Sequence, residues 1–256
     1  MLPSEADIAE AQVTRNKPVD PAAIHAAREK LRTMIATDLQ TSLHTTYQAL
    51  ADITGLEDEA MQQRKLKNVC LSYLMTLQDN DAINVAYQQF KNADNMTDQY
   101  AALTALMTCD CEQQNLALQD FEKQWSSETN VMDKWFAAQA SSSQGDTLKR
   151  VQSLMAHPKF DFKNPNKVRA LIGSFAMRNP RAFHAIDGKG YEFIAEQVLL
   201  LDKLNPQVAS RMVRAFMNWK QLEPIRQTLM QKQLQRIAST KDLSGDVYEI
   251  VSKSLQ

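Results

Sequence analysis

The sequence holds four histidines, which are His25, His44, His157 and His184. Imidazoles are common ligands of catalytic zinc, and in a His-Glu-x-x-His peptidase two of them lie four residues apart on one helix. The glutamate between them acts on the metal-bound water. No two histidines of this chain have that spacing. The sequence therefore predicts no metal site and no catalytic residue of this kind.

The three cysteines are Cys70, Cys109 and Cys111, and this small, odd number argues against a disulfide framework. Cys109 and Cys111 are two residues apart, which corresponds to roughly 200° around a helix. Thiols placed in this way point to different sides and cannot bind one ion unless the helix unwinds. We therefore interpret them as ordinary, partly buried cysteines.

Other catalytic motifs are also missing from the sequence. It has no Gly-x-Ser-x-Gly nucleophile turn and no glycine-rich phosphate loop. The segment 187–190, Asp-Gly-Lys-Gly, is too short and too cationic for a calcium loop. Paired carboxylates such as Asp79 and Asp81 lie where helices are expected to begin, and there acidic groups interact favourably with the helix dipole. We therefore expect no cofactor in this chain.

Two arginines are the remaining candidates for chemistry. Arg169 lies in NPNKVRALIGSF and Arg211 in NPQVASRMVRAF, at similar depth into segments that both begin with Asn-Pro. The planar guanidinium suits a carboxylate or a peptide backbone, so both residues are candidates for ligand binding. The alternative is that each arginine ties neighbouring helices together through a carbonyl or an acidic side chain.

The elements that position these arginines are predicted to be amphipathic helices. Apolar residues recur with a period of 3.6, whereas no segment keeps strict alternation long enough for a two-faced strand. The clearest stripes are Leu103, Leu106 and Met107; Val168, Leu171, Ile172 and Phe175; and Val208, Met212, Val213 and Phe216. Only 6 glycines occur in 256 residues, and this favours helices over hairpins.

The helix starts are marked by a polar residue followed by proline. These pairs are Asp20-Pro21, Asn164-Pro165, Asn179-Pro180, Asn205-Pro206 and Glu223-Pro224. Thr97 and Thr129 are predicted to cap two more helices. About a dozen helices with short links predict an all-α fold, a superhelical array of antiparallel helix pairs like HEAT or armadillo α-solenoids. Segment 182–193, which contains two glycines, is predicted to be a loop with a function.

The composition limits the partners of the chain. The 29 basic and 30 acidic residues give a net charge of −1, so no general attraction to nucleic acid or to a membrane surface is expected. The first residues lack the features of a signal peptide, and no run of about 18 apolar residues occurs. We therefore predict a cytoplasmic protein that binds neither nucleic acid nor a membrane.

Six segments match one known family in their order along the chain. They are NMTDQYAALTALMT (95–108), VMDKWFAAQA (131–140), NPNKVRALIGSFA (164–176), NPRAFHAIDGKGYEFIAEQV (179–198), NPQVASRMVRAF (205–216) and LSGDVYEIVSKSL (243–255). Together they resemble the C-terminal helical domain of bacterial aminopeptidase N, the alanyl aminopeptidase of the thermolysin-like zinc metallopeptidases.

This resemblance implies that residues 1–256 form a single α-helical C-terminal domain and that the catalytic and β domains are absent from the chain. It implies a domain that closes over the catalytic domain and shapes the chamber through which peptides reach the active site for removal of the N-terminal residue. The implied partners are that catalytic domain and peptide substrates, and zinc is implied in the parent enzyme. By their motifs, Arg169 and Arg211 match two arginines of the family that face the chamber and contact the substrate.

The resemblance also implies what the chain lacks. The zinc ligands, the glutamate base and the Gly-x-Met-Glu-Asn segment of the family are absent, so the chain alone is expected to be inactive. Its opening, MLPSE, is typical of an interdomain junction, and a truncated or split product is expected. The alternative is a freestanding helical-repeat scaffold that binds a protein partner. An upstream reading frame that encodes His-Glu-x-x-His would favour the peptidase domain.

Overall fold

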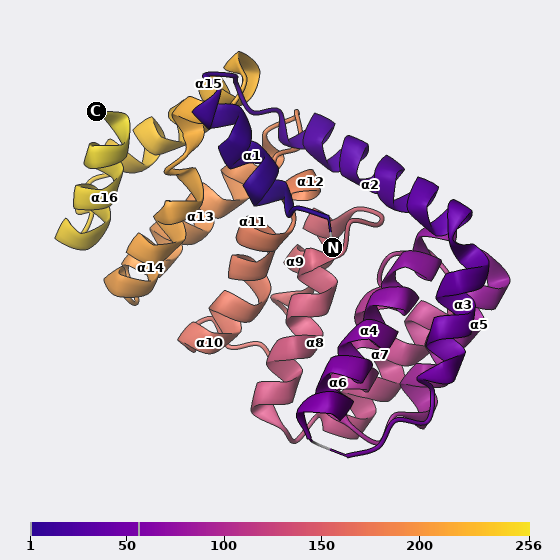
Figure 1. Cartoon of the computed structure of the whole chain (residues 1–256). Helices are drawn as coiled ribbons and strands as arrows, with labels where there is room; N and C mark the ends of the chain where they lie inside the picture. Colours follow the sequence, from indigo (N-terminus) through magenta and orange to yellow (C-terminus); the bar gives the residue numbers. More distant parts are fainter. Residues whose placement is uncertain (1, 56) are drawn as a thin grey trace. The chain divides into compact units, whose positions relative to one another are not determined.

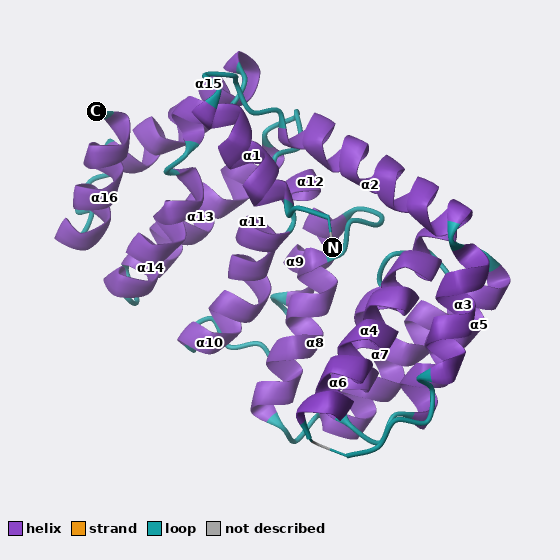
Figure 2. Cartoon of the chain, in the orientation of Figure 1, coloured by secondary structure: helices purple, strands orange, loops and turns teal. Residues whose placement is uncertain are grey.

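The computed structural model of the chain describes residues 2–55 and 57–256. It divides into two compact units, one made of residues 27–145 and the other of residues 1–26 with 146–256. Within the described residues, both units are built from helices joined by loops (Figure 2). The prediction of an all-α fold is confirmed.

The unit of residues 27–145 contains the end of α2 and the helices up to α8 (Figure 1). The bounds are α2 Pro21–Asp38, α3 Gln40–Ala49, α4 Asp58–Leu74, α5 Asn80–Asn92, α6 Met96–Leu106, α7 Glu112–Trp125 and α8 Thr129–Ser141, with a 3₁₀ turn at Met75–Leu77. From α3 onward each helix packs against the next, and α4, α5 and α6 also pack against α6, α7 and α8. Such contacts to the first and second neighbour are those of stacked helix pairs.

The unit of residues 1–26 and 146–256 has the same pattern of contacts. Its bounds are α1 Glu5–Thr14, α9 Thr147–Leu154, α10 Pro165–Val168, a π-helical turn Arg169–Gly173, α11 Ser174–Arg178, α12 Pro180–Phe183, α13 Lys189–Asp202, α14 Pro206–Val213, α15 Pro224–Ala238 and α16 Gly245–Leu255, with 3₁₀ turns at Arg214–Phe216 and Trp219–Gln221. Helix α13 packs against α14 and α15, and α16 packs against α14 and α15. The prediction of an α-solenoid is confirmed.

The predicted apolar stripes form the core of both units. Leu103 and Leu106 are fully buried in one unit, and Val168, Leu171 and Phe175 are fully buried in the other. Removal of this apolar surface from water is the main force that holds helices of such modest length in place. Within the part of the chain that the structure describes, every helix is too short or too polar to span a lipid bilayer.

The asparagine caps are as predicted, because Asn164, Asn179 and Asn205 each accept a hydrogen bond from a backbone N–H of the first turn. The two threonine caps are wrong. Helix α6 is capped by Asn95, whose side chain accepts from the N–H of Asp98 at 2.9 Å. Thr129 is the first residue of α8, after Glu128. Asn95 caps the helix instead of Thr97 because it directly precedes the first residue of α6, whereas Thr97 already lies in the first turn.

Candidate functional site

Arg169 is the first residue of the π-helical turn between α10 and α11. The side chain of Asn164 fixes the start of α10 by accepting from the N–H of Asn166 at 2.9 Å. Val168 and Leu171, on either side of the arginine, are fully buried, whereas Arg169 is exposed. Short π-helical turns within helices are frequent at functional sites. The burial of its neighbours therefore fixes the backbone that presents this guanidinium to solvent.

Arg211 lies in the last turn of α14. The side chain of Asn205 caps this helix by accepting from the N–H of Val208 at 3.2 Å. Met212 and Val213 follow the arginine and are buried, while Arg211 itself is exposed. The two arginines therefore have the same local design, in which an Asn-Pro start and a buried stripe leave one guanidinium on the surface.

The helices that carry the two arginines meet near their N-terminal ends. A cavity of about 150 Å³ is lined by Pro165 and Val168 of α10 and by Asn205 and Val208 of α14, among others. Arg169 directly follows Val168, and residues three apart on a helix, as Val208 and Arg211 are, share one face. Neither Arg169 nor Arg211 is among the residues that line this cavity, so the two arginines adjoin it only in sequence.

Neither guanidinium is engaged by another residue of the part of the chain that the structure describes. Across residues 2–55 and 57–256, neither Arg169 nor Arg211 makes a hydrogen bond or an ion pair through its side chain. The alternative interpretation was that each arginine connects neighbouring helices through a carbonyl or an acidic side chain. No such contact is formed among the described residues. Both cations remain available to a ligand, for which a carboxylate or a peptide carbonyl has the right chemistry.

The described residues offer no metal site. Among them, no three His, Cys, Asp or Glu side chains converge where an ion could bind. His25 instead pairs with Glu5 at 2.8 Å, and His184 hydrogen-bonds to Tyr191 at 2.7 Å. The side chains in the described part of the chain do not form a site that fits the zinc ion that the resemblance assigns to the parent enzyme.

The predicted loop 182–193 is mostly helical, because α12 ends at Phe183 and α13 begins at Lys189. Its polar groups are tied to α15. Arg226, which is buried, donates from Nε to the carbonyl of His184 at 2.7 Å and from Nη1 to Glu223 at 3.0 Å. The ring of His184 hydrogen-bonds to the Tyr191 hydroxyl. Residues 184–188 form a turn between the two helices, with Gly188 at a φ of 72°, and these contacts hold that turn by packing.

The free energy of unfolding should fall by about 2 kcal/mol between pH 7 and pH 5 because of His184. Burial, and then the charge of Arg226, lower the pKa of His184 from 6.5 to about 4. The unfolded chain takes up the proton first, so this stability is complete above about pH 6.5 and is lost as the pH falls toward 4. Urea unfolding at both pH values measures the loss. It should disappear in His184→Gln and persist in His44→Gln, and an unchanged loss in His184→Gln would contradict the assignment.

The helical placement of Cys109 and Cys111 is wrong. Helix α6 ends at Leu106 and α7 begins at Glu112, so both cysteines lie in the link. The thiol of Cys109 and the amide of Gln114 both donate to the carbonyl of Leu106, which satisfies the end of α6 and allows the helix to stop there. Burial, and then a hydrogen bond with Cys111, raise the pKa of Cys109 to about 12. Cys109 is therefore a protonated, unreactive thiol at neutral pH.

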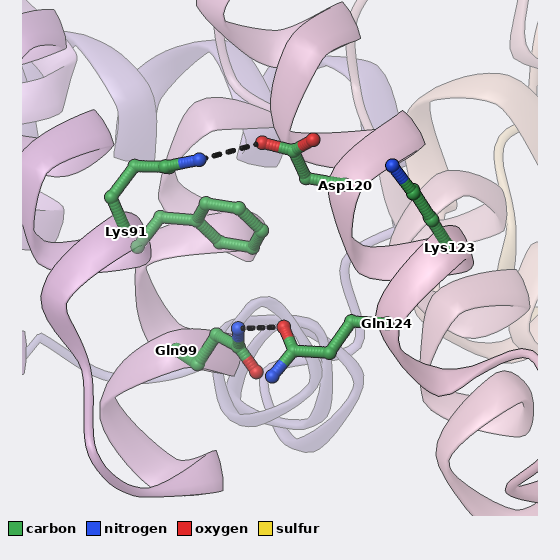
Figure 3. Close-up of a pocket in the computed structure, with 6 residues that line it drawn as sticks. Lys91, Gln99, Asp120, Lys123 and Gln124 are labelled. Atoms are coloured by element: carbon green, nitrogen blue, oxygen red, sulfur yellow. Dashed lines mark hydrogen bonds and ion pairs between the residues drawn. The ribbon is translucent and has the colours of Figure 1, made fainter.

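A second cavity, of about 360 Å³, lies between α5, α6 and α7 (Figure 3). Its polar groups are largely paired with one another. Figure 3 shows Lys91 pointing at Asp120, at 3.1 Å, and the amide of Gln99 donating to Gln124 at 2.8 Å. Since Gln99 also accepts from the indole of Trp125, these groups are already satisfied without a ligand. Most polar side chains around this cavity are therefore paired, with the exposed Lys123 an exception among the described residues.

One buried charged cluster is not predicted from the sequence. Arg64, Lys67 and Asp98 are each about 5% exposed or less, and Lys67 Nζ lies 2.6 Å from Asp98 Oδ2. A signal was present, because Arg64 and Lys67 follow Ala60 and precede Leu71 at spacings of four and three residues, within a helical apolar stripe. Charged residues in such a stripe indicate a buried polar group.

The contact pattern of stacked helix pairs defines the chain as an α-solenoid of the armadillo kind. A family model described as "Domain of unknown function (DUF3458_C) ARM repeats" matches residues 1–256, and the chain belongs to this family.

The relatives of the chain are aminopeptidases. Aminopeptidase N of Haemophilus influenzae is 37% identical over 260 residues, a match that takes in 100% of this chain and 29% of the relative. Aminopeptidase N of Escherichia coli is 38% identical over 238 residues, which cover 93% of this chain and 27% of the relative. Aminopeptidase N of Caulobacter vibrioides is 39% identical over 259 residues, which cover 99% of this chain and 29% of the relative. The resemblance to the C-terminal domain of aminopeptidase N is confirmed.

A solved structure has the same fold. The crystal structure of Legionella pneumophila aminopeptidase A in complex with aspartic acid matches with a TM-score of 0.87 and 31% identity, over 100% of this chain and 30% of that chain. The chain thus spans less than a third of the length of the relatives it matches.

Proposed function

We propose that this chain is the helical C-terminal domain, residues 1–256, of a cytoplasmic zinc aminopeptidase related to aminopeptidase N. In that role it closes over the catalytic domain and shapes the chamber through which peptides reach the active site for removal of the N-terminal residue. The observation that carries the proposal is the similarity to aminopeptidase N, which takes in 93% or more of the chain and under a third of each relative. The remainder of such a relative has the length needed for a catalytic domain.

Arg169 and Arg211 are the residues proposed to contact the peptide. Support comes from their exposure and from the absence of any hydrogen bond or ion pair to the rest of the described chain. In a partly desolvated chamber, a guanidinium binds a peptide carbonyl or a C-terminal carboxylate more strongly than it does in water. Contacts of this kind position the substrate, and the bond cleavage belongs to the catalytic domain.

In the complete enzyme, Arg211→Ala should raise KM for oligopeptides about tenfold, because one charge-assisted hydrogen bond is lost. KM for a small alanyl amide, which is too short to reach the arginine, should change by less than about twofold. Steady-state kinetics on both substrates measure the difference. Arg169→Ala should likewise raise KM for oligopeptides more than KM for the small amide.

Arg15→Ala is the matched control, since Arg15 is an exposed arginine of the same unit that directly follows α1, and it should change neither KM. If Arg211→Ala raised KM equally for the oligopeptide and the small amide, the proposed contact between Arg211 and the distal part of the peptide would be contradicted. If the chain occurred in the cell without an aminopeptidase catalytic domain, the alternative of a freestanding scaffold would be favoured.

A further inference from the structure

A third cavity, of about 420 Å³, adjoins the buried cluster of Arg64, Lys67 and Asp98 in the unit of residues 27–145. Its lining includes Lys67 and Asp98 at the inner wall and the exposed acids Asp52 and Asp94 at the rim. The lining is half apolar and half polar by area, which suits a small ligand with both characters.

The acceptor capacity of Asp98 is used within the protein. Its carboxylate accepts from Lys67 at 2.6 Å, from Asn68 at 2.8 Å and from Asn95 at 3.3 Å. Arg64 Nε lies 3.5 Å from the same carboxylate, close enough for an ion pair but not aligned for a hydrogen bond. One carboxylate therefore faces two buried cations, and the cluster has an excess of one positive charge.

The ammonium of Lys67 has unused hydrogen-bonding capacity. An ammonium has three N–H donors, and among the described residues Lys67 uses one, to Asp98. Lys67 is 4% exposed and lines the cavity, so an acceptor bound in the cavity can reach its two remaining donors. A buried polar group without partners is costly, and an anionic ligand group would supply the missing acceptors.

The neighbouring polar groups hold this arrangement in place. Tyr47 donates its hydroxyl to Gln89, and Gln89 donates to Asn68 and to the backbone carbonyl of Asp98. Burial, and then the charge of Asp98, raise the pKa of Tyr47 to about 12, so the phenol keeps its proton and remains a donor. The inner wall is therefore rigid, and its cation cannot move far to find another partner.

The rim has the opposite charge. Asp52 and Asp94 are exposed carboxylates in the lining of the same cavity, and they would repel a simple anion. A ligand that carries both a carboxylate and an ammonium can satisfy the cation and the rim acids at once. We infer that this cavity binds a small zwitterion, a free amino acid or a dipeptide, with its carboxylate on Lys67 and its ammonium toward Asp94 and Asp52. This inference does not depend on the proposed function.

Isothermal titration calorimetry of the full chain with L-leucine and with L-leucyl-L-leucine tests the inference. Comparison of the two affinities shows whether the cavity prefers a free amino acid or a dipeptide. Two analogues serve as matched probes: 4-methylpentanoate, which lacks the amine, and 3-methylbutylamine, which lacks the carboxylate. The zwitterion should bind at least about fivefold more tightly than either, because each analogue loses one charged contact. Shifts of the backbone amide signals of Gln89 and Ala93 on addition of the ligand should locate it.

Asp94→Asn should weaken binding of the zwitterion about fivefold and should not weaken binding of 4-methylpentanoate. Asp120→Asn, a change of an exposed acid outside this cavity, should leave both unchanged. Lys67→Met should abolish binding, but it also removes a buried partner of Asp98, so Asp94→Asn carries the test if that variant does not fold. The inference fails if neither zwitterion binds, if the analogues bind equally well, or if Asp94→Asn leaves the affinity for leucine unchanged.

Discussion

Asp98→Asn should lower the free energy of unfolding by about 3 kcal/mol or more. The substitution keeps the shape and part of the hydrogen bonding of the side chain but removes its charge. Arg64 and Lys67 would then be two cations, each about 5% exposed or less, without a buried counter-ion. Removing one partner of a buried ion pair is expensive because the remaining charge keeps its desolvation cost.

Urea unfolding of the full chain, followed by far-UV circular dichroism, measures this loss. Asp120→Asn is the matched control, because Asp120 pairs with Lys91 at 3.1 Å while both side chains are more than 40% exposed. Such a pair contributes at most about 1 kcal/mol in water. If the two substitutions had similar effects, Asp98 would not be the counter-ion of a buried cluster.

The fold was predictable from the sequence because its determinants are local. The stripes of Val168, Leu171 and Phe175 and of Leu103 and Leu106 repeat at helical spacing, and each helix buries the face that its own sequence defines. The Asn-Pro starts are also local, since a cap and the residue it satisfies lie within one turn. Neither feature requires knowledge of which helices become neighbours.

The features that were missed depend on contacts between distant residues. Lys67 and Asp98 are 31 residues apart, and only the packing of α4 against α6 turns two ordinary surface charges into a buried pair. The link at Cys109 and Cys111 exists because Gln114 satisfies the carbonyl of Leu106 from the next helix. Helical spacing alone cannot indicate such a stop, since an apolar run reads as helix whether or not its last carbonyls find partners.

The candidate site was only partly predictable. The shared context of Arg169 and Arg211 is visible in the sequence, but whether a guanidinium is engaged by a neighbour is decided by the fold. The π-helical turn at Arg169–Gly173 has no sequence pattern of its own, because the segment keeps a continuous helical stripe. The free guanidinium groups therefore follow from the structure, and the role in peptide binding remains a prediction.

Gly190→Ala should destabilise the protein by about 3 kcal/mol or more. Gly190 is the second residue of α13, and a Cβ at this position would clash with the carbonyl oxygen of Phe183 and lie 2.9 Å from its Cα. Both are backbone atoms of α12, so no rotation of a side chain relieves the clash. The two helices would have to separate, and Phe183, whose ring packs against Phe175, Tyr191 and Phe216, would move with them.

Thermal and urea unfolding of Gly190→Ala should therefore show a large loss, together with a changed near-ultraviolet spectrum as the aromatic cluster around Phe183 loosens. Gly245→Ala is the matched control, since Gly245 begins α16 and no atom lies within 4 Å of an added Cβ. Alanine is also the better helix former, so this control should be neutral or stabilising by about 0.5 kcal/mol. A small effect at Gly190 would mean that α12 and α13 can separate without cost, and the close approach would then not determine how segment 182–193 is held.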